Sequence, residues 1–110
     1  DDAVAGFLTS GGTESILCGV LAARERAAAE RGITAPEMVV AESAHAAFHK
    51  AAHNFGLTLH TAPVKDDWTA DVDAMADLCG PNTVLVVGSV GGATVLVVVD
   101  AAITPWTAMR

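Results

Sequence analysis

The chain has 110 residues, of which 52% are hydrophobic and 5% aromatic, a composition typical of a globular domain held together by aliphatic side chains and not of a disordered segment. Its formal net charge of −7, from 13 acidic and 6 basic residues, argues against nucleic acid and anionic membrane surfaces as partners. Cys18 and Cys79 lack the spacing of a zinc site or a disulfide framework. We therefore expect free thiols in a reducing cytoplasm.

The chain begins at Asp1 without an initiator Met and ends at Arg110 shortly after an apolar run, so we expect a fragment of a larger protein. The acidic N-terminus has no long apolar segment of the kind found in signal peptides, which favours a cytoplasmic location. The stretch from Thr83 to Val99 is uncharged and apolar, but glycines interrupt it. We expect two buried strands around a glycine loop there, and no membrane span.

Short apolar runs alternate with longer segments of helical pattern along the chain. The expected elements are a strand at Gly6–Thr9, a helix at Thr13–Arg31 ended by Gly32, a strand at Met38–Ala41, a helix at His45–Phe55 closed by Gly56, a strand at Leu57–Val64, a helix at Trp68–Leu78 and a strand at Thr83–Val87. This alternation predicts right-handed βαβ units. The fold class is therefore α/β, with three layers and a mainly parallel sheet flanked by helices.

Polar turns are expected after three of the strands, at Ser10–Thr13, at Glu42–His45 and at Gly88–Ser89. Because ligands of open α/β sheets collect outside the carboxyl ends of the strands, these turns predict a pocket on one rim. The first turn places two glycines and several hydroxyls before a helix, a pattern that can hold a phosphate through main-chain N–H groups. An ordinary helix cap by Ser10 or Thr13 explains the same residues.

Three segments carry a resemblance to a known family: Leu8-Thr9-Ser10-Gly11-Gly12-Thr13-Glu14-Ser15, Ser43-Ala44-His45-Ala46-Ala47-Phe48-His49-Lys50-Ala51-Ala52, and Phe55-Gly56-Leu57. The chain resembles the sphingosine-1-phosphate lyase branch of the group II pyridoxal-phosphate-dependent decarboxylases. The resemblance continues through Asn82-Thr83-Val84 to Val87-Gly88-Ser89. It implies a partial large domain of a fold type I pyridoxal 5'-phosphate enzyme that is a homodimer at full length.

Several site residues follow from this resemblance. Gly11, Gly12 and Thr13 match the loop for the cofactor phosphate, His45 matches the catalytic imidazole that stacks on the cofactor ring, and Ser89 matches a strand-end serine near the cofactor. The implied reaction is cleavage of a carbon–carbon bond next to an amine. The implied substrate is a small-molecule amine, either a phosphorylated amino alcohol in an aldehyde-lyase or an amino acid in a decarboxylase of the glutamate or aromatic type.

The chain also departs from the family pattern. The family's cofactor lysine lies in a His-Lys pair well downstream, whereas the His49-Lys50 pair belongs to the helix motif, so Lys50 is expected to be a solvated or structural residue. We therefore expect this segment alone to be inactive. Ser89-Val90-Gly91-Gly92-Ala93 lacks the Ala-Pro usual after the serine of the lyases, and is similar to the glycine-containing turn of amino-acid decarboxylases. Asp100 matches either the aspartate that follows this loop in the family or the aspartate of the family's Val-Asp-Ala cofactor motif.

Two other kinds of site, a metal site and a serine nucleophile, fit the sequence less well. His45, His49 and His53 recur every four residues, but no carboxylate or Cys is placed to complete a tetrahedral set, and we expect no metal. Ser43 close to His45 invites a nucleophile interpretation, yet an N-cap of the following helix explains Ser43 better. A catalytically inactive phosphate-binding α/β module remains the alternative outside enzymes.

Overall fold

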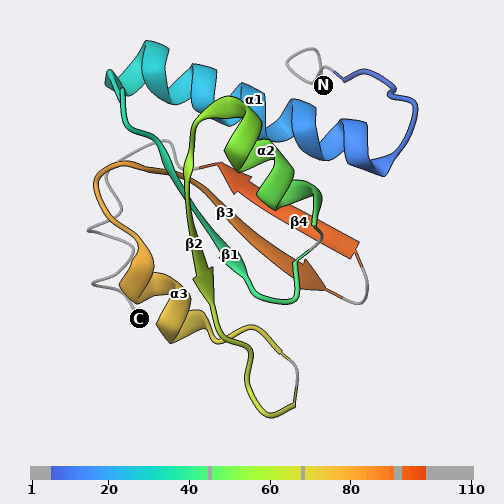
Figure 1. Cartoon of the computed structure of the whole chain (residues 1–110), viewed down its shortest axis with the longest axis vertical. Helices are drawn as coiled ribbons and strands as arrows, with labels where there is room; N and C mark the ends of the chain where they lie inside the picture. Colours follow the sequence, from blue (N-terminus) through green and yellow to red (C-terminus); the bar gives the residue numbers. More distant parts are fainter. Residues whose placement is uncertain (1–5, 45, 68, 91–92, 99–110) are drawn as a thin grey trace.

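Four strands form one sheet with helices on both faces (Figure 1). The computed structural model describes residues 6–44, 46–67, 69–90 and 93–98, with the main chain alone for 89–90 and 93–98. The elements are α1 (Gly12–Arg31), β1 (Glu37–Ala41), α2 (Ala47–Phe55), β2 (Thr58–Ala62), α3 (Val72–Leu78), β3 (Thr83–Val90) and β4 (Ala93–Val98).

The strand order is β2-β1-β3-β4, and β1 runs parallel to both of its neighbours. Its register with β2 runs from Glu37↔Thr58 to Ala41↔Ala62. The register with β3 shifts between Glu37 and Met38. Strand β4 pairs antiparallel with β3, so the two strands predicted between Thr83 and Val99 are present. The α/β class with a mainly parallel sheet is confirmed as well.

The side chains of β1 alternate between two apolar clusters, as a strand buried on both faces requires. Met38 and Val40 point into a cluster shared with α1 and α2, where Val20 and Phe48 are fully buried. Val39 and Ala41 belong to a second cluster that includes Ala62 and Met75. In Figure 1, α1 and α2 lie together on one side of the sheet and α3 lies apart from them. The predicted three layers are therefore present.

Glycines end the first two helices, as predicted. Gly32 and Gly56 have φ of 66° and 72°, in the left-handed region that favours glycine. The N–H of Gly32 donates to the carbonyl of Ala28 at 3.2 Å, which satisfies one of the last helical acceptors. These two glycines set where the chain leaves each helix for the following strand.

Hydrogen bonds join α1 and the turn before β3 at the amino edge of the sheet. The Arg31 guanidinium donates to the carbonyls of Pro81 and Thr83, at 2.9 and 3.3 Å. Thr83 is fully buried, and its hydroxyl oxygen accepts from the Gly80 N–H at 2.8 Å. The Thr83 N–H in turn donates to the Gly80 carbonyl at 3.1 Å. The C-terminal end of α1 is thereby fixed at the amino edge.

The predicted strand at Gly6–Thr9 is wrong. Residues 6–9 have no regular structure, and Phe7 and Leu8 are 76% and 100% exposed. A strand needs a neighbour to accept and donate its main-chain hydrogen bonds, and within the described residues this segment has none. An apolar run alone does not supply that neighbour.

Two further predicted features are corrected. The helix after β1 begins at Ala47 with Ala46 as N-cap and no side-chain cap, so Ser43 is not its cap. The physical reason is a separate turn after β1, closed by the Ala44 N–H donating to the Ala41 carbonyl at 2.9 Å. Gly88 and Ser89 form no turn, because pairing with β4 extends β3 to Val90.

Other expected elements are present but shorter. Strand β2 ends at Ala62, before Pro63, which has no N–H for a ladder. Helix α3 begins at Val72, because the side chain of Asp71 accepts from the Ala74 N–H at 3.1 Å and caps it there. Trp68, where that helix was predicted to start, lies outside the described residues.

Candidate functional site

The first turn of α1 lies toward the carboxyl edge of the sheet. Arg31, at the other end of this 20-residue helix, bonds to carbonyls at the amino end of β3. A helix of that length extends about 30 Å, which is longer than the strands it covers. Figure 1 shows the start of α1 on the side where β1 and β3 end. Ligand sites of α/β sheets lie at this edge.

The loop at Gly11 and Gly12 leaves the start of α1 uncovered. Gly11, Gly12 and Thr13 are all exposed, and no described side chain caps the helix. A Cβ placed on either glycine would meet nothing within 4 Å. Because the first N–H groups of a helix have no partner within it, they are accessible here to an anion. Gly11 has an extended φ of 170°, which any residue can adopt, so its backbone conformation does not require glycine. What the glycines contribute is the absence of a side chain that would cover the main chain.

Two side-chain pairs close the loop on either side of these glycines. The Ser10 N–H donates to Glu14 Oε2 at 3.1 Å, and the Ser10 hydroxyl donates to the same oxygen. Thr9 Oγ1 lies 2.6 Å from Ser15 Oγ. The hydroxyl of Ser10, followed by its N–H, lowers the pKa of the Glu14 carboxyl. Ser10 therefore bonds to Glu14 and does not cap α1.

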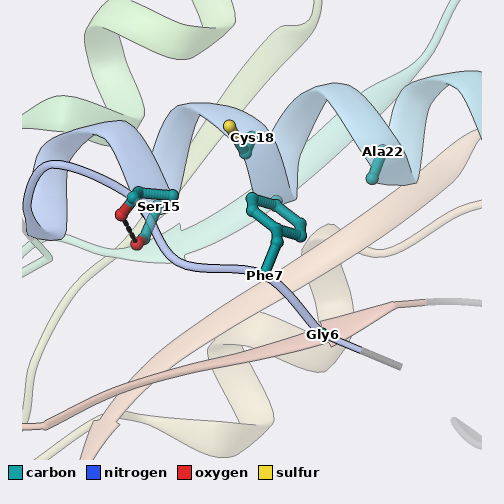
Figure 2. Close-up of a pocket in the computed structure, with 7 residues that line it drawn as sticks. Gly6, Phe7, Ser15, Cys18 and Ala22 are labelled. Carbon is teal, nitrogen blue, oxygen red and sulfur yellow. Dashed lines mark hydrogen bonds between the residues drawn. The ribbon is translucent and has the colours of Figure 1, made fainter. Parts of the chain in front are cut away.

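An open groove of about 600 Å³ runs between the N-terminal segment and α1. Figure 2 shows Phe7 reaching toward Cys18 and Ala22 of the helix, with Ser15 at the end nearer the glycine loop. The lining is mainly apolar. A second, smaller hollow lies at the amino edge, where the guanidinium of Arg24 donates to the Phe55 carbonyl at 2.9 Å.

The turn after β1 begins with Glu42, at the same edge as the glycine loop. The Glu42 N–H donates to the Ala62 carbonyl at 2.8 Å, and Glu42 Oε1 accepts from the Val64 N–H at 3.3 Å. Sequence reasoning missed this role of Glu42. The signal was present, since a carboxylate directly follows a buried strand, but its partner lies 22 residues away.

The structure describes some of the predicted site residues and not others. Gly11, Gly12 and Thr13 form the open start of α1, whereas His45 lies outside the described residues. The main chain of Ser89 pairs with Thr94, one residue before β3 ends, and its side chain lies outside the description. Lys50 is exposed on α2, as expected for a solvated helix residue.

The remaining histidines follow two patterns. His49 and His53 are exposed on α2, and His60 Nε2 lies 2.5 Å from Glu37 Oε1 across the β1–β2 pair. Within the described ranges, no group of three His, Cys, Asp or Glu side chains is arranged to hold a metal ion. None of the helices in these ranges is long and apolar enough to cross a membrane.

Comparison with known proteins identifies relatives over most of the chain. The chain is 44% identical over 89 residues to the sphingosine-1-phosphate lyase of Oryza sativa, which covers 81% of this chain and 16% of that protein. It is 44% identical over 87 residues to a probable L-tyrosine/L-aspartate decarboxylase of Methanothermobacter thermautotrophicus, covering 79% of this chain and 23% of the relative. No family model matches.

A solved structure agrees with these relatives. The sphingosine-1-phosphate lyase of Burkholderia pseudomallei matches with a TM-score of 0.68 and 49% identity, over 69% of this chain and 18% of that one. The chain is homologous to part of the group II pyridoxal-phosphate-dependent decarboxylases. Sphingosine-1-phosphate lyases are among these homologues, so the predicted resemblance is confirmed. The chain spans about a sixth of the length of the rice lyase.

Proposed function

We propose that this chain belongs to a pyridoxal-phosphate-dependent carbon–carbon lyase of the sphingosine-1-phosphate lyase kind, and that it supplies the loop for the cofactor phosphate. The open start of α1 at Gly11, Gly12 and Thr13 carries the proposal. The 49% identity to a solved lyase supports the assignment of that loop to this cofactor rather than to another anion.

The described residues fit the phosphate end of pyridoxal phosphate. The first-turn N–H groups of α1 are exposed donors, and the positive end of the helix dipole favours a dianion. The space above both glycines admits a phosphate oxygen close to the main chain. The Glu14 carboxylate opposes an anion through its charge, but it accepts from Ser10 and leaves the N–H groups of Gly12 and Thr13 to the ligand.

Each residue has a distinct task in this proposal. Gly11 and Gly12 admit the phosphate, Thr13 adds a hydroxyl donor, and the imidazole of His45 packs against the ring and influences its protonation. Ser89 lies near the ring at the end of β3. The chemistry supplied by bound pyridoxal phosphate is an electron sink for the carbon–carbon bond that breaks next to the amine.

An amino-acid decarboxylase is the second candidate, and the archaeal decarboxylase at 44% identity favours it. The proposed substrate is accordingly a small-molecule amine, a phosphorylated amino alcohol in the first case and an amino acid in the second. The proposal includes a homodimer at full length, as the resemblance implies. It also includes a cytoplasmic location, supported by the free thiols of Cys18 and Cys79.

Ligand binding tests the phosphate loop directly. We expect the chain to bind pyridoxal phosphate at least about tenfold more tightly than pyridoxal, because the phosphate gains charge-assisted hydrogen bonds worth about 1.5–3 kcal/mol each. Inorganic phosphate should compete. Thr13→Val should weaken binding, whereas Thr34→Val, which alters an exposed threonine before β1, should not. Equal affinity for pyridoxal and its phosphate would refute the loop assignment.

The ring contact needs a separate variant. His45→Ala should weaken binding of pyridoxal phosphate several-fold, by about the 0.5–1.5 kcal/mol of an aromatic stacking pair. The His53→Ala variant, which removes an exposed imidazole near the other end of α2, is the matched control. An affinity that His45→Ala leaves unchanged would remove His45 from the site and leave the phosphate loop untouched.

A further inference from the structure

Glu42 joins the end of β1 to both sides of Pro63. Its N–H donates to the carbonyl of Ala62 at 2.8 Å, which adds one hydrogen bond beyond the last register pair of β1 and β2. Its Oε1 accepts from the N–H of Val64 at 3.3 Å. One exposed side chain therefore connects two loops at the carboxyl edge of the sheet.

Pro63 explains why a side chain is needed there. Proline has no N–H, so the next main-chain donor after β2 is that of Val64. In a continued parallel ladder this N–H would meet the main-chain carbonyl of Glu42. The carboxylate takes that place, and the main chain after β1 turns away, with the Ala44 N–H donating to the Ala41 carbonyl.

The loop on the other side of this contact is held firmly. Val64 forms a bridge with Ala70, and the Lys65 N–H donates to the Thr69 carbonyl at 2.8 Å. The side chain of Val64 packs against the cluster beneath α3. Glu42 is therefore attached to a point that is fixed by the sheet, by the loop and by the core.

We propose that Glu42 is a positioning residue, which uses its carboxylate to set where residues 42–44 leave the sheet. This inference rests on the proposed function, because His45, the proposed ring contact, directly follows residues 42–44 in the sequence. Glu42 touches neither ring nor phosphate in this scheme. It acts through the direction of the turn, and an amide oxygen in its place can do the same.

Three variants of the full 110-residue chain test the inference. Glu42→Ala removes the acceptor, Glu42→Gln keeps an Oε1 acceptor without charge, and Asp66→Ala removes an equal charge from an exposed position two residues after Val64. The readouts are hydrogen exchange of the Val64 amide by NMR and affinity for pyridoxal phosphate. In Glu42→Ala we expect exchange about tenfold faster and affinity about three- to tenfold weaker. Glu42→Gln and Asp66→Ala should resemble the unmodified chain in both.

The expected loss of affinity runs against simple electrostatics, because removing a negative charge favours an anionic ligand. An unchanged or tighter affinity in Glu42→Ala, with rapid exchange at Val64, would overturn the inference. Unchanged exchange at Val64 would overturn it as well, whether or not the cofactor binds. Failure of the unmodified chain to bind pyridoxal phosphate would instead overturn the proposed function, and the exchange readout would still decide whether Glu42 holds the turn.

Discussion

Thr83→Val tests the amino edge of the sheet with little change in side-chain volume. Thr83 is fully buried at the start of β3, and its hydroxyl oxygen accepts from the Gly80 N–H at 2.8 Å. Valine fills the same space with a methyl group and suits a strand equally well. The substitution therefore removes one acceptor and leaves the Gly80 N–H without it.

The expected cost follows from that orphaned donor. A buried polar group that loses its partner costs about 1–3 kcal/mol, and the half-buried position of Gly80 places the loss toward the middle of this range. With a urea dependence of about 2 kcal/mol per molar for a chain of this size, the unfolding midpoint should fall by about 1 M. That is a substantial part of a total stability of about 5–15 kcal/mol.

Urea denaturation followed by circular dichroism measures this loss, and amide exchange at Gly80 identifies its source. Thr83→Ser keeps the hydroxyl and removes one methyl group, which costs about 1 kcal/mol through lost burial. The Gly80 amide should remain protected in Thr83→Ser and become labile in Thr83→Val. If Thr83→Val is as stable as the unmodified chain and its Gly80 amide stays protected, the hydroxyl does not hold this turn.

Asp71→Ala should cost about 0.5–2 kcal/mol in urea denaturation, because it removes the cap that accepts from the Ala74 N–H, and equal stability would show that α3 does not depend on it. The Thr69 hydroxyl and N–H lower the pKa of Asp67 below its ordinary 3.8, so this contact adds stability above the unfolded pKa and loses it as the pH falls through the folded pKa. The Thr69 amide shift should titrate below 3.8, and a higher midpoint contradicts the contact. Burial raises the pKa of the Cys79 thiol, so iodoacetamide at pH 8 should modify it more slowly than a cysteine in an unstructured peptide, and equal rates would argue against that burial.

Local chemistry was enough for the ends of the first two helices. Gly32 and Gly56 adopt the left-handed conformation that their positions after Arg31 and Phe55 predict. The helix after the glycine loop was also predicted, with a start at Thr13, one residue after the observed start at Gly12. In each case the deciding interaction joins residues only a few positions apart, so a short window of sequence contains it.

Long-range pairing decided the rest. Residues 6–9 have the composition of a strand but no neighbour in the described sheet, and Ser89 lies within a strand because β4 pairs beside it. Glu42 acquires its role only when folding brings Val64 to the end of β1. The sequence by itself determined where the first two helices end, since that depends on the backbone conformation of a glycine next to the helix. Only the tertiary structure decided which donors and acceptors meet at the rim, because a hydrogen-bond partner is defined by position in space.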